Sequence, residues 1–287
     1  MLLSIYGDVI LPHGGEIPLG SLVDAGSVLG ISEQTARSSM NRLVADGWFV
    51  SEPVGRRSIY RLSAVGTIRM LTAQARVFQI SDDRWNGKWQ IIMTNPASPD
   101  TESAQDISLG LLWIGFGQVS EHVFIRPEIG EDNGCYLTNF GVAPKTGEIC
   151  FSASTLTCVS NDSVDEMVRR AWALDILESR YKAFIERYEA VLAAVWKHPK
   201  CSGEKAFAIR SFMIHDFRRL RVIDPQLPSA LLPDNWSGAR ALYVAHELYD
   251  LLIPESERFI MERIEGPNGK LPQLDIGFYQ RFGGLSR

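Results

Sequence analysis

The stretch that most constrains the fold is 30–62, where one helical pattern gives way to two strand patterns. Ser32 can cap a helix whose apolar residues recur on one face, and Gly47 ends that helix. An extended run follows and ends at Pro53, and a Gly-Arg-Arg turn leads into a second run over 58–62. A helix followed by an arginine-tipped hairpin is typical of a DNA-reading helix and its β-wing.

The face of this helix opposite its apolar residues carries polar and basic side chains. Short polar groups suit base edges, and arginines suit phosphates. The alternative interpretation is a solvated surface helix and turn on an ordinary α+β domain. We favour DNA because helix, turn and arginine pair follow one another in this order. The candidate DNA-binding residues are Gln34, Thr35, Arg37, Ser38, Asn41, Arg42, Arg56 and Arg57.

Overall charge gives no general indication of a nucleic-acid partner, since the formal net charge is -5. The first 66 residues hold five arginines against six acidic residues. All five arginines fall in the predicted helix and hairpin, so the local field there is positive although the region is near neutral. These arginines are Arg37, Arg42, Arg56, Arg57 and Arg61.

Length and composition predict a soluble globular protein of two or three domains, since the chain has 287 residues and is 45% hydrophobic. No apolar run approaches the roughly 18 residues that a membrane span needs, and the start lacks a basic leader. We therefore expect a cytoplasmic protein without a membrane partner. The four cysteines are too widely spaced for a metal knuckle and too few for a disulfide scaffold. We predict no metal site and no cofactor.

Upstream of the predicted reading helix, the pattern indicates a further helix that Ser21 caps and that Gly30 closes. Two short helices joined so tightly are typical of a helix-turn-helix. An apolar helical segment over 2–11 precedes them and breaks at a Pro-His-Gly-Gly turn, where we expect His13 to lie on the surface.

The rest of the chain alternates strands and helices and then becomes helical. After the hairpin, a helix over 67–79 has Ile68, Leu71, Ala75 and Phe78 as its apolar stripe. We expect strands over 88–94, 118–125 and 148–157, with a helix over 100–116. The C-terminal part is predicted to hold helices over 163–199, 204–222 and 237–265, the last interrupted at Pro254, and a loose tail after Gly266.

Residue types that could support catalysis are present but not in working patterns. His215 and Asp216 are adjacent on a helix and so do not face each other. The sequence has no Gly-x-Ser-x-Gly elbow and no Gly-rich phosphate loop. We therefore predict that the protein is not an enzyme.

Several motifs in order resemble the PaaX-type repressors of phenylacetic acid degradation, and the resemblance spans nearly the whole chain. The motifs are SIYGD, LPHGGEI, DGWF, VGRRSIYRLS, WNGKW, GFG followed by VFIRP, DPQLP, LLP and WSG. The resemblance implies an α+β multidomain protein. Its parts would be a GntR-like winged helix-turn-helix over 1–82, a ferredoxin-like central domain over 83–160, and a helical C-terminal domain over 161–287.

The middle domain also resembles the ferredoxin-like nuclease of CRISPR adaptation, which is expected to hold a metal on an acidic residue after its first strand. Asn95 stands near that place here, and a neutral amide cannot replace the charge of a carboxylate on a hard divalent cation. We therefore interpret this module as structural, and as a contact of a homodimer.

For the ligand, the resemblance implies an effector of the aryl-acetyl-CoA type, such as phenylacetyl-CoA. Its phosphates would need Arg or Lys, and the predicted effector-binding residues are Arg218, Arg221 and Trp236. An ordinary solvated arginine face is the alternative for the two arginines. Two function classes remain: a ligand-released repressor bound to double-stranded operator DNA, and a nucleic-acid-processing enzyme or nuclease that uses the winged helix as a scaffold.

Overall fold

The computed structural model describes residues 1–55, 57–78, 80, 85–94, 108–112, 114–129, 149–153, 163–198 and 201–286. The chain forms two compact units. Unit 1 comprises Met1–Ile80, Ala183–Arg219 and Ala239–Arg287, and unit 2 comprises Ser81–Lys182 and Leu220–Gly238. Unit 1 thus joins the N-terminal residues to most of the C-terminal helices, whereas the sequence predicted a separate helical domain. The predicted boundaries at 82/83 and 160/161 lie outside the described residues.

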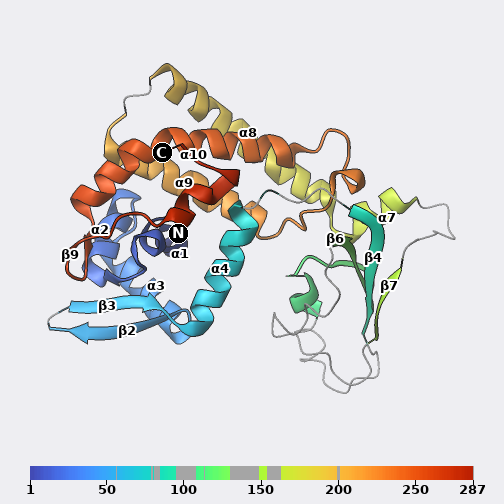
Figure 1. Cartoon of the computed structure of the whole chain (residues 1–287), viewed down its shortest axis with the longest axis horizontal. Helices are drawn as coiled ribbons and strands as arrows, with labels where there is room; N and C mark the ends of the chain where they lie inside the picture. The colour runs from blue at the N-terminus through green and yellow to red at the C-terminus, as the bar shows by residue number, and fades with distance from the viewer. Residues whose placement is uncertain are drawn as a thin grey trace. The chain divides into compact units, whose positions relative to one another are not determined.

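The N-terminal part of unit 1 combines short helices with a three-stranded antiparallel sheet (Figure 1). The strands lie in the order β1-β3-β2, and β2 pairs with β3 from Phe49 opposite Leu62 to Val54 opposite Arg57. In chain order the elements are α1 (Leu2–Ile5), the helical turns Tyr6–Ile10 and Leu11–His13, β1 (Ile17–Pro18), α2 (Leu19–Val28), α3 (Glu33–Ala45), β2 (Phe49–Val54), β3 (Arg57–Leu62) and α4 (Ala64–Phe78).

Two local predictions for this part were wrong. Pro53 does not end its strand but lies within β2, which is tolerated because β2 is an edge strand and a proline can face outward there. Ser21 does not cap α2, because the helix begins earlier, at Leu19, with Pro18 as its N-cap and no side-chain cap. The predicted cap at Ser32 is confirmed, since the Ser32 hydroxyl accepts from the amide of Thr35.

The face that α4 buries also differs from the predicted one. Gly66, Met70, Ala73 and Val77 point into the core, whereas the predicted stripe of Ile68, Leu71, Ala75 and Phe78 is exposed or half-buried. Gly66 explains the rotation: a Cβ on this residue would lie 2.0 Å from the carbonyl oxygen of Trp48. Only the side of the helix that bears this glycine can approach the backbone so closely.

The remaining elements of unit 1 come from the end of the chain. They belong to α8 (Leu174–Lys197), α9 (Gly203–Arg221), α10 (Ser237–Arg263), the small hairpin of β8 (Glu265–Gly266) and β9 (Gly269–Lys270), and the helical turns Ile276–Gly283. The first part of α8, the C-terminal end of α9 and the N-terminal end of α10 belong to unit 2. Pro254 lies inside α10 without ending it, and the tail after Gly266 packs inward with Phe278, Arg281 and Phe282 buried, so both predictions were wrong.

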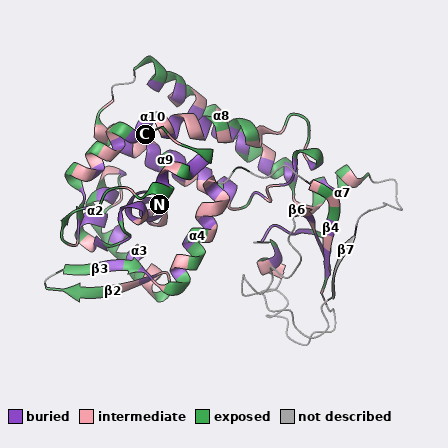
Figure 2. Cartoon of the chain, viewed as in Figure 1, coloured by how far each residue is buried: buried purple, intermediate pink, exposed green. Residues whose placement is uncertain are grey.

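One hydrophobic core unites these distant segments. Side chains from the N-terminal helices, α3 and the sheet, such as Ile5, Met40 and Tyr60, form one buried cluster with Phe207 of α9 and Ile260 of α10. The buried residues run along the inner faces of these elements, while the tip of the β2–β3 hairpin is exposed (Figure 2). The N-terminal elements therefore complete their core with residues that are more than 130 positions further along the chain.

A buried polar network lies at the centre of unit 1. Arg210 is fully buried and donates to Asp8 Oδ2 at 3.0 Å, to Glu257 Oε1 at 2.5 Å and to the Tyr249 hydroxyl at 3.1 Å. Arg281 donates to Asp8 Oδ1 at 2.8 Å. Two buried cations thus face two carboxylates, which satisfies the requirement that buried charges be paired.

His13 joins this network, so its predicted place on the surface was wrong. Its side chain is 1% exposed, Nε2 lies 3.0 Å from Glu257 Oε2, and Nδ1 lies 2.5 Å from the carbonyl oxygen of Pro272. The returning C-terminal segment covers the Pro-Gly turn that carries His13. That segment is far away in sequence, so the local pattern could not reveal it.

Glu257 predicts an acid sensitivity of the fold. Burial opposes ionisation, but the charge of Arg210 and hydrogen bonds from His13 and Arg210 lower the pKa of Glu257 from 4.5 to about 2. Because the folded-state pKa lies below the unfolded value, the stabilisation is complete above about pH 4.5 and is lost as the pH falls through 2. It amounts to about 3 kcal/mol by linkage.

Urea unfolding between pH 7 and pH 3 checks this expectation. Glu257→Gln should be less stable at pH 7. As the pH is lowered, its free energy of unfolding should fall less steeply than that of the wild type. Glu255→Gln, which removes only an exposed pair with Arg258, is the matched control and should keep the wild-type slope. An unchanged slope in Glu257→Gln would contradict the assignment.

Unit 2 is built on a four-stranded antiparallel sheet in the order β5-β6-β4-β7. Its strands are β4 (Trp85–Met93), β5 (Gly117–Ser120), β6 (Val123–Ile129) and β7 (Ile149–Ala153), and α7 (Val164–Ala171) follows. Trp89 and Ile91 pack with Val168 and Leu174 in one core cluster, and Ile92 and Phe124 pack with residues of 111–116 in another.

Two predicted elements in unit 2 are divided in the structure. The strand expected over 118–125 is two strands, β5 and β6, joined by a turn at 121–122. The helix expected over 163–199 breaks at Ala173, whose φ of 48° ends α7 before α8 begins. The helix predicted over 100–116 lies partly outside the described residues, which show a helical segment over 108–112.

Candidate nucleic-acid interface

Helix α3 presents the predicted DNA-binding side chains to solvent. Ala36 is 0% exposed and Met40 1% exposed, so they anchor the inner face of the helix in the core. The opposite face is open, as the sequence predicted. Its exposed residues are Gln34, Thr35, Arg37, Ser38, Asn41 and Arg42.

Local bonds hold part of this outward face in place. The Thr35 hydroxyl lies 2.9 Å from that of Ser32, and Ser38 Oγ donates to the carbonyl oxygen of Thr35 at 3.1 Å. Arg37 Nε donates to Glu33 at 2.8 Å, one turn earlier. In the described part of the chain, Gln34, Asn41 and Arg42 make no side-chain hydrogen bond, which leaves their amide and guanidinium groups available to a partner.

The connection between α2 and α3 is short and tightly bonded. Gly30 takes a φ of 76°, a conformation that favours glycine, and the amide of Ile31 donates to the carbonyl oxygen of Gly26. Ser32 then starts α3. The two helices are thereby fixed relative to each other, and both pack in the same core.

The β2–β3 hairpin supplies the second group of predicted residues. Gly55, with a φ of 60°, turns the chain, and Arg57 begins β3 with its side chain exposed. Arg56 lies outside the described residues. Arg61 donates to Glu52 across the hairpin at 2.5 Å, so this arginine is bound to a strand neighbour.

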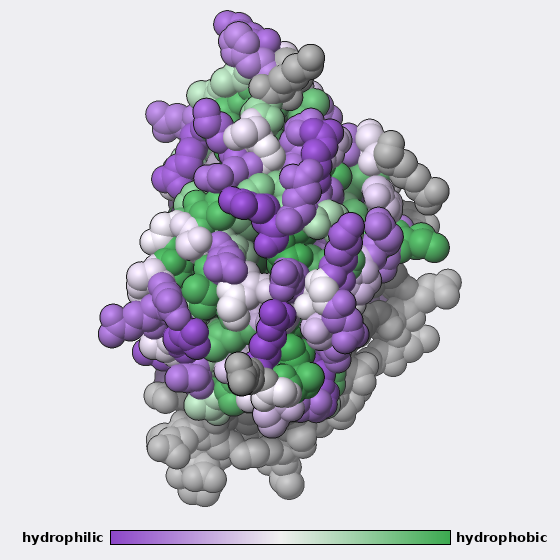
Figure 3. Space-filling view, turned by 90° about the vertical axis from the view of Figure 1, so that its left-hand side faces the viewer, coloured by the Kyte–Doolittle hydropathy of each residue, from purple (hydrophilic) through white to green (hydrophobic). Residues whose placement is uncertain are grey.

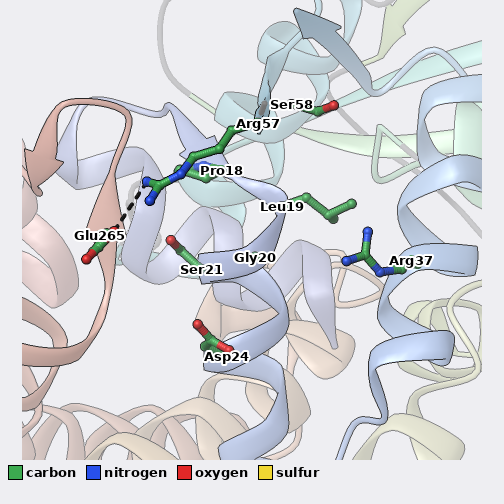
Figure 4. A pocket seen from close by; sticks show the side chains of 9 residues that line it. All are labelled: Pro18, Leu19, Gly20, Ser21, Asp24, Arg37, Arg57, Ser58 and Glu265. Atoms are coloured by element: carbon green, nitrogen blue, oxygen red, sulfur yellow. Dashed lines mark hydrogen bonds and ion pairs between the residues drawn. The ribbon is translucent and has the colours of Figure 1, made fainter. Parts of the chain in front are cut away.

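A cavity of about 330 Å³ lies between α3 and the start of β3 (Figure 4). Arg37 and Arg57 line it together with Ser21 and Asp24 of α2. Arg57 Nη1 lies 3.3 Å from Glu265 Oε2 of β8, and both side chains are more than half exposed. The sequence interpretation missed Glu265, because this residue was predicted to be the end of a helix, whereas it lies in strand β8.

Figure 3 shows the side of the molecule toward which the tip of the β2–β3 hairpin points in Figure 1. Purple side chains project over much of this side, with apolar areas between them. Such a surface suits a polar partner better than an apolar one.

The three predicted effector-binding residues do not gather in one unit. Arg218 is half-buried in unit 1, where it lines a small cavity with Ser4, Met70 and Phe78, and burial lowers the pKa of its guanidinium. Arg221 and Trp236 belong to unit 2. Arg221 is buried and pairs with Asp224 at 3.4 Å.

Trp236 packs edge-on against Tyr181, with ring centroids 5.7 Å apart, and the Tyr181 hydroxyl donates to Asp224. Arg221, Trp236 and Asp224 therefore surround Tyr181 in unit 2, where burial raises the pKa of the phenol. This cluster satisfies its charges internally, so Arg221 is less suited to binding phosphate than the sequence indicated.

The two residues that resemble a catalytic pair have different partners. His215 Nδ1 lies 2.9 Å from the Ser4 hydroxyl, and burial lowers the pKa of His215 to about 4. Asp216 accepts from Arg187 at 2.6 Å and from Tyr188 at 2.9 Å. The carboxylate therefore does not orient the imidazole.

Within the described residues, no group of three or more His, Cys, Asp or Glu side chains is placed to hold a metal ion. Within the same residues, no helix combines the length and the apolar character that crossing a membrane requires. Asn95, the position compared with a nuclease metal ligand, lies outside the described part.

Comparisons with known proteins agree with the motifs. Residues 1–66 match the family described as PaaX-like protein, and residues 172–262 match the PaaX-like protein C-terminal domain. The chain is 31% identical over 288 residues to the transcriptional repressor PaaX of Escherichia coli strain K12, with 100% of this chain and 90% of that protein covered.

Among solved structures, the uncharacterized protein Rv0674 from Mycobacterium tuberculosis is similar with a TM-score of 0.48 at 18% identity, over 83% of this chain and 89% of that one. The identity to the curated repressor and its nearly full coverage of both chains establish the relationship. The protein belongs to the PaaX family of transcriptional repressors.

Proposed function

We propose that the protein is a DNA-binding transcriptional repressor of phenylacetate-type aromatic-acid catabolic genes. The observation that carries this proposal is the open polar face of α3, held beside an arginine-bearing hairpin in a member of the PaaX family. In this proposal α2, α3 and the β2–β3 hairpin form a winged helix-turn-helix. Helix α3 enters the major groove and the hairpin lies over the flanking phosphates.

The sheet of unit 2 supports the second part of the fold proposal. An order of β5-β6-β4-β7 with antiparallel neighbours is the order of a ferredoxin-like βαββαβ sheet. We propose that this ferredoxin-like module contributes to a homodimer. A symmetric dimer would present two copies of α3 to half-sites about 34 Å apart or a multiple of that distance.

The proposed effector is an aryl-acetyl-CoA that releases the repressor from its operator. A ligand can lower DNA affinity only by the factor by which it prefers the conformation that does not bind DNA. A coupling of about 1–3 kcal/mol corresponds to roughly 5- to 150-fold weaker operator binding. Of the three predicted residues, Arg218 remains the candidate contact for an anionic group, because within the described residues it has no ion-pair partner.

Fluorescence anisotropy with the promoter DNA next to the gene tests the function. The purified protein should bind this fragment more tightly than random DNA of the same length, and phenylacetyl-CoA should weaken the binding. Free CoA is the ligand control. Equal affinity for promoter and random DNA would refute the repressor proposal, whereas specific binding that no thioester changes would refute only the effector.

Arg57→Ala should weaken DNA binding on all sequences alike, because we assign this exposed arginine to a phosphate. The slope of log affinity against log salt should decrease by about 0.9 for the lost contact. Glu265→Gln removes the acidic neighbour of Arg57 and should act in the opposite direction, raising the affinity up to about 5-fold, since an exposed pair contributes at most about 1 kcal/mol. Loss of discrimination between sequences in Arg57→Ala would instead indicate base contact.

A further inference from the structure

A second cavity in unit 1, of about 730 Å³, lies between α4 and the C-terminal turns Ile276–Gly283. This volume lies within the range of small-molecule sites. Its walls are mainly apolar, and two of these apolar side chains are exposed to solvent: Leu71 is 53% and Ile80 60% exposed. The apolar lining residues are Leu11, Pro12, Leu71, Ala75, Phe78, Ile80 and Phe278.

The chemistry of the polar lining points to an uncharged ligand. The Arg281 guanidinium lies between two aromatic rings, 4.5 Å from the centroid of Phe78 and 4.6 Å from that of Phe278. Its charge is already matched by Asp8, at 2.8 Å. A free carboxylate that entered the cavity would lose its hydration, and Arg281 would not offer it an unpaired charge in return.

The rim offers a hydrogen-bond donor for a carbonyl group. Gln280 lines the cavity and is exposed, and among the described residues its amide has no partner. An aromatic ring would cover the open faces of Leu71 and Ile80, while the carbonyl oxygen next to it would accept from Gln280. An aryl-acyl thioester combines an uncharged carbonyl with such a ring, whereas the corresponding free acid is an anion.

The cavity is connected to the DNA-reading elements through α4. Gln74 in the cavity wall donates to the carbonyl oxygen of Gly7 at 2.6 Å, and Arg281 donates to the same oxygen at 3.2 Å. At the other end of the helix, Ser63 Oγ donates to the carbonyl oxygen of Gly47, which follows α3, and accepts from the amide of Gly66. A ligand that displaced α4 would therefore strain the junction between α3 and β2.

We propose that this cavity receives the aryl-acyl group of the effector, with the CoA part remaining outside. The inference rests on the proposed function, in which such a thioester releases the repressor. It assigns the recognition of the acyl group to α4 and the C-terminal turns, rather than to the cluster of Arg221 and Trp236 in unit 2.

Isothermal titration of the full-length protein with phenylacetyl-CoA tests the site. Ala75→Trp fills the cavity from α4 and should weaken binding at least tenfold. Ile68→Trp adds the same side chain two turns earlier on the same face of α4, outside the cavity, and should bind like the wild type. Gln280→Leu, an exposed substitution that spares the core, should weaken binding about 5-fold through the loss of one hydrogen bond.

Operator binding without ligand separates the possible failures. All three variants should retain it, because none touches α3 or the hairpin, and retention also shows that Ala75→Trp is folded. Unchanged thioester affinity in Ala75→Trp and Gln280→Leu would overturn the cavity assignment while leaving the repressor intact. Phenylacetate binding as tight as phenylacetyl-CoA binding would overturn the ligand class, as would the absence of thioester binding to the wild type.

Discussion

Replacing Arg210 with methionine is expected to lower the free energy of unfolding by about 3–5 kcal/mol, the cost of removing one partner from a buried ion pair. Arg210 has no exposed surface, and its loss leaves Asp8 and Glu257 with fewer donors in the same enclosed space. Methionine keeps much of the volume, so the missing charge and hydrogen bonds dominate the effect. Urea unfolding followed by circular dichroism measures it.

The matched control is Arg240→Met. Arg240 also lies within hydrogen-bond distance of a carboxylate, but this pair is on the surface. Arg240 lies 2.6 Å from Glu189, with the two side chains 55% and 41% exposed. Solvent screens this pair, so the expected change is below about 1 kcal/mol. Similar losses in the two variants would show that the buried network does not carry the stability assigned to it.

Gln34→Ala is expected to reduce the preference for the operator over random DNA by about 5- to 150-fold, which corresponds to the 1–3 kcal/mol of a two-hydrogen-bond contact to a base. Gln34 is exposed on α3, and its amide is uncommitted within the described residues. Competition binding with operator, single-base operator variants and random DNA measures the change.

Arg57→Ala is the comparison variant, and the salt dependence of DNA binding distinguishes the two. The salt dependence should remain unchanged in Gln34→Ala and decrease in Arg57→Ala, because only the arginine replaces a counterion. An equal loss of affinity on operator and on random DNA in Gln34→Ala would show that α3 does not read bases through this residue.

The local part of the fold could be predicted from the sequence because its causes lie within one or two turns of chain. Ser32, Ala36, Met40 and Gly47 specify α3 by capping, periodicity and a left-handed stop, and the structure confirms each of them. The exposed face of α3 follows from the same periodicity. This face carries six of the eight predicted DNA-binding residues.

The remainder depends on partners that are distant in sequence. Arg210 lies in the core because it pairs with Asp8, 202 positions away, and the residue pattern of its own helix does not reveal this partner. The buried face of α4 depends on how closely Gly66 approaches Trp48, which residue spacing cannot show. Glu265 was missed because it was predicted to end a helix, whereas it lies in β8, where it pairs with the distant Arg57. In each case the local pattern gives the residue type but not its surroundings.

The contact between Asp8 and Arg281 spans 273 positions of the chain. During synthesis, Asp8 leaves the ribosome 273 residues before its buried partner Arg281. Until then the N-terminal elements lack one of the two cations that pair with Asp8 and part of their apolar core. A chain that ends before Arg281 is therefore expected to leave the fold of unit 1 incomplete, rather than to present a stable α3 and hairpin on its own.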